Sequence, residues 1–98
     1  MLDFRDVDPR ELRVPSFHRL GADPAKLARQ IALFGRSAVG MPAPWVYEAT
    51  DGVLVVYSGV TRATRIAKLA PGAPLRVEVI GKLPQAFAGE PKIGDLLP

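Results

Sequence analysis

Proline and glycine interrupt this chain so often that only short helices and strands fit between them. The sequence has ten prolines and nine glycines among its 98 residues. Proline lacks a backbone N–H donor and glycine is conformationally free, so both tend to end regular elements. A chain of this length makes one domain with a modest core, and its hydrophobic content of 48% is typical of a globular fold.

The composition excludes several kinds of chemistry. There is no cysteine, so disulfides, thiolate metal sites and cysteine nucleophiles are ruled out. His18 is the only histidine, and Asp3, Asp6 and Asp8 lack the glycine and the closing glutamate of a calcium loop, so we expect no resident metal. Because no apolar run reaches the length of a membrane span and no hydrophobic leader opens the chain, we expect a cytoplasmic protein.

The apolar spacing predicts a small α+β domain with a mixed sheet and two main helices. Asp23 and Pro24 suit the start of a helix over 24–34, which Gly35 ends. A second helix over 60–70 ends at Pro71-Gly72. The predicted strands are 2–7, 45–49, 53–57 and 75–80, with a hairpin turn at Asp51-Gly52.

Two strands and the tail carry more specific predictions. Residues 53–57 are apolar throughout, which favours a central strand covered on both faces. Residues 75–80 alternate between apolar and charged side chains, which favours a half-exposed strand at the sheet edge. We assign 1–83 to the domain and 84–98 to a Pro/Gly-rich C-terminal tail that wraps the surface or is loose.

Positive charge gathers in one part of the chain. The formal net charge is +3 and the sequence pI is about 9.7. A positive zone attracts anions such as phosphates, although a solvated basic face explains any single charge equally well. Residues 53–82 contain Arg62, Arg65, Lys68, Arg76 and Lys82 against Glu78 alone.

The junction between the strand 53–57 and the second helix resembles an anion site in outline. The first amides of a helix have no internal partners and lie at the positive end of its dipole. Gly59 allows an anion to approach the backbone closely, and Thr61 adds a hydroxyl donor.

Helical phase singles out Arg62. It lies at the border of the apolar face, whereas Arg65 and Lys68 are expected to face solvent. A half-buried arginine in the first turn opposes the helix dipole, so an anion should compensate it. That anion is either a ligand or a carboxylate of the protein, for which Glu48 is the candidate.

The sequence DGVLVVYSGVTRATRIAKLAPGAPLRVEVI, residues 51–80, resembles the ParB/sulfiredoxin-like domain family. That family has a strand, a turn of the form G-x-[HRT]-R, an alanine-rich helix, a turn that contains glycine, and a further strand. The resemblance covers roughly residues 3–82 and depends on the order of several short motifs. Upstream, that order is followed by Val7-Asp8-Pro9, Phe17-His18-Arg19, the helix ending at Gly35, and Pro44-Trp45-Val46.

The resemblance implies that Gly59, Val60, Thr61 and Arg62, here called the 59–62 turn, bind phosphate groups with help from Arg19. In ParB-like members this loop holds a nucleotide triphosphate. In sulfiredoxins it carries a cysteine that attacks an oxidised peroxiredoxin, but here Val60 replaces the cysteine and Thr61 the histidine after it. The resemblance therefore implies no reductase activity, and without a helix-turn-helix domain we expect no standalone partition protein.

Three functions remain open on these grounds. The first is a module that binds the phosphate of a nucleotide or nucleic acid at the 59–62 turn. If the module is an enzyme, it hydrolyses this ligand. A nucleotide would bring Mg²⁺ with it. Hydrolysis would need Glu48, Asp51 or His18 as a base or metal-holding group. The second is a toxin-type effector domain. The third is a partner-binding protein with a degenerate site, which docks through strand 75–80 or the C-terminal tail.

Three other side chains offer weaker signals. His18, beside Arg19, could contact a phosphate or act as a general base, and a surface role is the alternative. Trp45 and Tyr47 lie on one strand face and could stack on bases, with packing as the alternative. Neither Ser37 nor Ser58 has evident partners for a nucleophilic triad.

Overall fold

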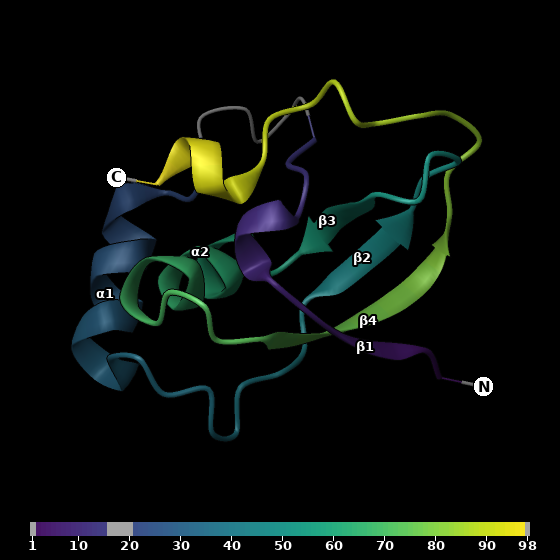
Figure 1. The fold of residues 1–98 in the computed structure, drawn as a ribbon. Helices are drawn as coiled ribbons and strands as arrows, with labels where there is room; N and C mark the ends of the chain where they lie inside the picture. Colours follow the sequence, from purple (N-terminus) through teal and green to yellow (C-terminus); the bar gives the residue numbers. More distant parts are fainter. Residues whose placement is uncertain (1, 16–20, 98) are drawn as a thin grey trace.

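The elements follow the order predicted from the sequence (Figure 1). The computed structural model describes residues 2–15 and 21–97, which form a small α+β domain with a four-stranded mixed sheet and two α-helices. The predicted fold class is therefore confirmed. The elements are β1 (Phe4–Val7), η1 (Pro9–Glu11), α1 (Pro24–Phe34), β2 (Trp45–Glu48), β3 (Leu54–Ser58), α2 (Val60–Leu69), β4 (Leu75–Lys82) and η3 (Ile93–Leu96), where η marks a 3₁₀ helix.

Local capping sets the bounds of α1. The Asp23 carboxylate accepts hydrogen bonds from the backbone N–H groups of Ala25 and Lys26, at 2.8 and 3.4 Å. Gly35 ends the helix with a φ of 56°, in the region that favours glycine. Both boundaries match the prediction because both depend on residues next to each other in the chain.

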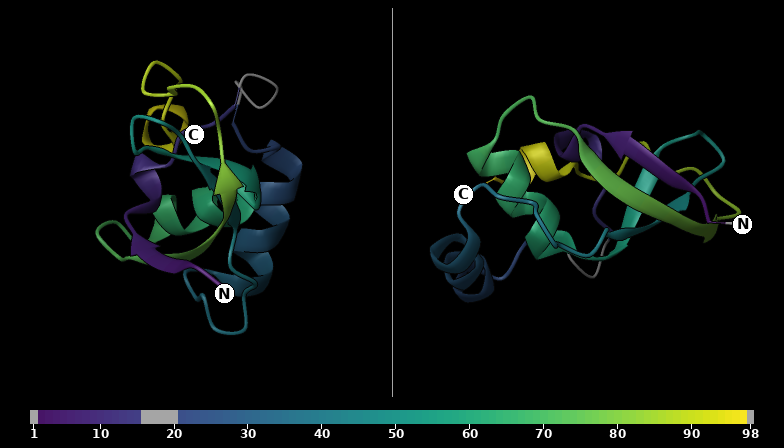
Figure 2. Two further views of the ribbon diagram at one scale, coloured as in Figure 1. Left: turned by 90° about the vertical axis from the view of Figure 1, so that its right-hand side faces the viewer. Right: turned by 90° about the horizontal axis from the view of Figure 1, so that it is seen from below.

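The sheet order is β1-β4-β2-β3. β1 is antiparallel to β4 and β2 is antiparallel to β3, whereas β2 and β4 are parallel. The chain therefore makes the hairpin β2–β3, passes through α2, and returns along the other side of β2 (Figures 1 and 2).

The prediction of a central strand over 53–57 is wrong, because β3 lies at the end of the strand order. Its outer edge is covered by the segment around Arg13, whose N–H donates to Leu54 O at 2.8 Å and whose carbonyl accepts from Val56 N at 3.0 Å. Val55 and Val56 are both buried. The apolar strand is therefore buried although it is last in the strand order, and Arg13 pairs with part of its outer edge.

The prediction of an edge strand over 75–80 is also wrong. β4 lies between β1 and β2 in the strand order, and it pairs with β1 over residues 75–78 and with β2 over residues 78–82. The alternation of apolar and charged residues indicates that one face of the strand is buried and the other exposed. It does not indicate whether the strand lies at the edge or in the middle of the sheet.

The core joins α2 to one face of the sheet and to both 3₁₀ helices. Buried residues of α2, such as Ile66, pack with Val46, Val56 and Val77 of the sheet. Ile93 in the C-terminal segment is 1% exposed and belongs to the same cluster.

The helix α1 lies outside α2 and is covered on one side only (Figure 2). Of the apolar face predicted for it, which comprised Leu27, Ala28, Ile31 and Phe34, only Leu27 is buried, and Phe34 is 55% exposed. Among residues 2–15 and 21–97, no helix has both the length and the apolar character needed to cross a bilayer.

Candidate anion-binding site

Gly59, at the start of α2, lies in close contact with Pro44 and with the side chain of Arg62. Its φ is 103°, in the left-handed region. A Cβ atom at this position would lie 2.9 Å from Pro44 Cβ and 2.7 Å from Arg62 Nη2. Only glycine fits here without displacing its neighbours, and the backbone stays open to close approach.

The first turn of α2 has free donors. Among the described residues, no side chain caps this helix, and the first bond across its start runs from Ala63 N to Gly59 O at 2.9 Å. The N–H groups of residues 60–62 therefore lie at the positive end of the helix without an intrahelical partner. Val60 is 6% exposed, so it offers its amide rather than its side chain.

Arg62 is half-buried, as its helical phase predicts. Its guanidinium folds back toward Gly59 rather than extending into solvent. Among the described residues it makes no ion pair, and its Nε atom is buried without a hydrogen-bond partner. A cation at the N-terminal end of a helix is disfavoured, so this arrangement gains from an added anion.

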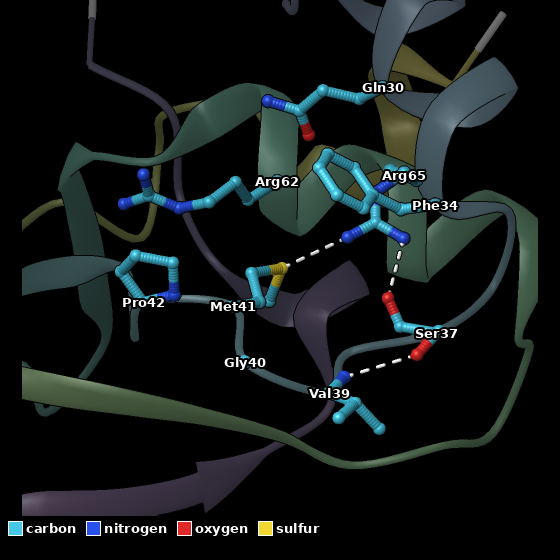
Figure 3. Close-up of a pocket in the computed structure, with 9 residues that line it drawn as sticks. All are labelled: Gln30, Phe34, Ser37, Val39, Gly40, Met41, Pro42, Arg62 and Arg65. Carbon is cyan, nitrogen blue, oxygen red and sulfur yellow. Dashed lines mark hydrogen bonds between the residues drawn. The ribbon is translucent and has the colours of Figure 1, made fainter.

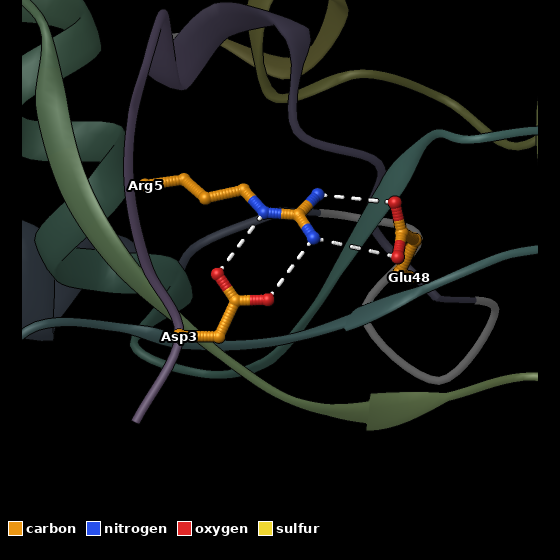
Figure 4. Close-up of polar contacts among 3 residues, drawn as sticks. All are labelled: Asp3, Arg5 and Glu48. Carbon is orange, nitrogen blue, oxygen red and sulfur yellow. Dashed lines mark hydrogen bonds and ion pairs between the residues drawn. The ribbon is translucent and has the colours of Figure 1, made fainter. Parts of the chain in front are cut away.

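The alternative in which Glu48 compensates Arg62 is wrong. Glu48 Oε2 is instead 3.0 Å from Arg5 Nη1, and Arg5 also binds Asp3 (Figure 4). The hydrogen bond from Arg5 lowers the pKa of Glu48, and the pair raises the pKa of Arg5. Since Glu48 pairs with Leu54, it lies at the far end of the hairpin from Gly59.

Asp51 is likewise engaged away from the 59–62 turn. Its Oδ2 accepts hydrogen bonds from Phe87 N at 3.1 Å and Ala88 N at 2.8 Å. Neither carboxylate considered for hydrolysis is thus placed beside Arg62, and His18 and Arg19 lie outside the described residues. Within the described ranges, no three acidic or histidine side chains are grouped so as to hold a metal ion.

Arg65 does not face solvent, contrary to the prediction, because α1 packs against that side of α2. It is 1% exposed, and its Nη1 donates to the carbonyl oxygen of Gly35 at 2.7 Å. The same Nη1 donates to the carbonyl oxygen of Ser37 at 2.8 Å (Figure 3). Its guanidinium lies 5.4 Å from the centre of the Phe34 ring. Burial lowers the pKa of Arg65. Arg65 therefore closes the carbonyl end of α1, a role that the sequence did not indicate.

Thr61 and Arg62 line different hollows. Thr61, with Val60, Lys26 and Asp23, lines an open hollow of about 550 Å³ between the starts of the two helices. Arg62 lines a smaller cavity with Arg65 and Gln30. Lys68 is exposed, as predicted. The 59–62 turn therefore presents backbone N–H groups and two polar side chains, but not in one common pocket.

The two aromatic residues of β2 differ in their surroundings. Tyr47 is partly buried, packs edge-on against Tyr57 at 5.5 Å and lies over Gly81. Trp45 is 47% exposed. Packing thus accounts for Tyr47, whereas Trp45, which pairs with Ser58 at the end of β3, keeps a free surface.

Comparisons with protein-family models, with curated proteins and with solved structures find no match for this chain. The resemblance to the ParB/sulfiredoxin-like family therefore stays a prediction, and the geometry of the site carries the functional argument.

Proposed function

We propose that this protein binds a phosphate-bearing ligand, a nucleotide or nucleic acid, at the 59–62 turn. The observation that carries this proposal is Arg62, whose half-buried guanidinium lies against Gly59 at the start of its own helix with no carboxylate partner among the described residues. A phosphate group there would meet free backbone N–H groups and a guanidinium that forms charge-assisted bonds. The net charge of +3 favours the approach of such a ligand.

The same geometry favours binding over hydrolysis. Among the described residues, no aspartate or glutamate lines the cavity that Arg62 borders, and Glu48 and Asp51 are occupied elsewhere. Hydrolysis of a phosphate ester needs a base or a metal-holding carboxylate near the phosphorus. Binding without turnover is therefore the simpler expectation.

Titration with inorganic pyrophosphate, a nucleoside triphosphate and a short single-stranded oligonucleotide tests the proposal. Arg62→Ala should weaken binding roughly 10- to 150-fold, as expected for the loss of a charge-assisted bond worth about 1.5–3 kcal/mol. Lys68→Ala is the matched control, because Lys68 is an exposed cation on the same helix, and it should bind like the wild type. Equal binding by the wild type and Arg62→Ala, or no binding by the wild type, would reject the site.

The exposure of Trp45 distinguishes a mononucleotide from a nucleic acid. Trp45 is the single tryptophan of the chain, so its fluorescence reports on this face alone. An oligonucleotide bound at the 59–62 turn should quench it by stacking, whereas pyrophosphate should not. Phosphate-dependent binding without quenching would favour a small ligand.

A further inference from the structure

Met41 places its sulfur against the buried guanidinium of Arg65 (Figure 3). Arg65 Nη2 donates a hydrogen bond to Met41 Sδ at 3.2 Å. Met41 lies in the loop 35–44, between α1 and β2, and is half-buried, whereas Arg65 is 1% exposed. Both side chains line a cavity of about 120 Å³ between this loop and the two α-helices. The sulfur therefore lies beside a buried cation and close to free space.

The hydrogen-bonding capacity of Arg65 is only partly used. Its Nη1 donates to the carbonyl oxygens of Gly35 and Ser37. Among the described residues, its Nε has no partner and its Nη2 has only the Met41 sulfur, which is a weak acceptor. No carboxylate within those residues forms an ion pair with it. Because buried polar groups in folded proteins almost always have a partner, a stronger acceptor at the position of the sulfur should be favoured.

Oxidation of the thioether would supply such an acceptor. A methionine sulfoxide carries a strongly polar oxygen on its sulfur, and in an apolar core this change is disruptive. Here the sulfur already contacts a charged donor, and hydrogen bonds to charged donors are stronger than those between neutral groups. The methionine side chain is flexible, and the cavity leaves room for one oxygen atom, which is smaller than a water molecule of ~30 Å³. The oxidised side chain should therefore be held more firmly than the reduced one.

The composition of the chain makes Met41 a selective target. The chain has no cysteine, and Met1 is its only other methionine. Met1 lies outside the described residues, so Met41 carries the one sulfur atom within them. Residues 36–40, which precede it in the loop, are all exposed, and hydrogen peroxide is little larger than water. An oxidant of that size can therefore reach the half-buried sulfur.

We propose that Met41 is an oxidation site, and that its sulfoxide oxygen accepts a hydrogen bond from Arg65 and tightens the contact between the loop 35–44 and α2. With hydrogen peroxide as the oxidant, a lone pair of Sδ attacks one peroxide oxygen, so that the S–O bond forms as the O–O bond breaks. The proton on the attacked oxygen passes to the departing oxygen, which leaves as water. The sulfur loses two electrons and the peroxide gains them. This site goes beyond the proposed phosphate site and does not depend on it.

Treatment of the folded protein with hydrogen peroxide tests the proposal. Mass spectrometry of proteolytic peptides should show one added oxygen atom on Met41. Oxidation should raise Tm by about 4 °C or more, the shift that one hydrogen bond to a charged group gives a domain of this size. Met41→Leu removes the sulfur and keeps an apolar side chain, so peroxide should leave the Tm of this variant unchanged. The variant therefore also measures any effect of oxidising Met1.

Met41→Gln mimics the sulfoxide without an oxidant. The glutamine Cδ and Oε1 take the places of the sulfur and its oxygen, so this variant should melt about 4 °C or more above the untreated wild type. Val39→Gln is the matched control, because Val39 lies in the same loop and is 93% exposed, and its Tm should match that of the wild type. Arg65→Leu removes the donor, so oxidation of Met41 should lower the Tm of this variant. Met41→Gln keeps the test decisive even where Arg65→Leu does not fold.

Three results would overturn the proposal: failure of peroxide to oxidise Met41 in the folded protein, an oxidised wild type whose Tm is unchanged or lower, or a Met41→Gln variant no more stable than Val39→Gln. Equal gains in Tm on oxidation of the wild type and of Arg65→Leu would show that Arg65 does not hold the sulfoxide, and would overturn it as well. None of these results depends on phosphate binding, so this site and the proposed function fail independently.

Discussion

The two ends of the β2–β3 hairpin differ in how their polar groups are paired. At the turn, Asp51 accepts backbone N–H groups of the C-terminal segment, and nearby Glu48 is held by Arg5. At the other end, the first turn of α2 has no side-chain cap, and Arg62 has no carboxylate partner among the described residues. Paired carboxylates stabilise the fold, whereas an unpaired cation beside free amides is available to a ligand.

The largest loss of stability is expected on substitution of Arg65, which lies on α2 and is fully buried. Arg65→Ala removes both bonds to the carbonyl oxygens that follow α1 and leaves a cavity, so it should lower the free energy of unfolding by about 3 kcal/mol. Urea denaturation measures this loss. Arg65→Met keeps most of the volume and should cost less. A loss below about 1 kcal/mol for Arg65→Ala would contradict the capping role.

The second largest loss of stability is expected on substitution of Gly59. Gly59→Ala places a Cβ against Pro44 at a φ of 103°, so we expect a loss of about 2 kcal/mol. The new methyl group would also displace the Arg62 guanidinium, so phosphate affinity should fall as well. Gly72→Ala is the control, because its φ is also positive but no atom lies within 4 Å of the added Cβ. Its cost should be about 1 kcal/mol, and equal losses would argue against the Pro44 contact.

Asp51, at the turn between β2 and β3, should make the stability of the fold depend on acidic pH. Desolvation alone raises the pKa of Asp51, but hydrogen bonds from the backbone N–H groups of Ala88, Val53 and Phe87 outweigh it and lower the pKa. Because the folded protein binds this proton less readily than the unfolded chain does, the stabilisation is complete at neutral pH and is lost as the pH falls below about 4.

Melting curves between neutral and acid pH check this expectation. Asp51→Asn cannot titrate at this position, so its Tm should fall less steeply with pH than that of the wild type. Identical pH profiles for the two proteins would show that Asp51 does not hold the C-terminal segment through its charge.

The smallest effect on stability is expected at Arg62. Arg62→Ala removes a cation that opposes the helix dipole and an unpaired Nε, so the free energy of unfolding should change by no more than about 0.5 kcal/mol. The same variant should lose phosphate binding. A loss of stability near that of Arg65→Ala would make Arg62 a structural residue and remove the contrast between the two ends.

The local elements could be predicted because their signals are local. Asp23 and Gly35 cap α1 through neighbours within four residues, and the predicted helix 24–34 matches Pro24–Phe34. The second helix and the hairpin turn at Asp51-Gly52 follow from the same kind of signal. For the candidate site, helical phase correctly placed Arg62 at the border between buried and exposed surface.

The sequence by itself therefore determined the α+β class, the helices and the half-buried position of Arg62. Only the tertiary structure decided that β4 lies inside the sheet, that Arg65 is buried under α1 and that Glu48 binds Arg5. These outcomes depend on contacts between residues far apart in the chain. The spacing of apolar residues tells which side of a helix or strand is apolar. Whether that side or the polar side is buried depends on how the other elements pack against it.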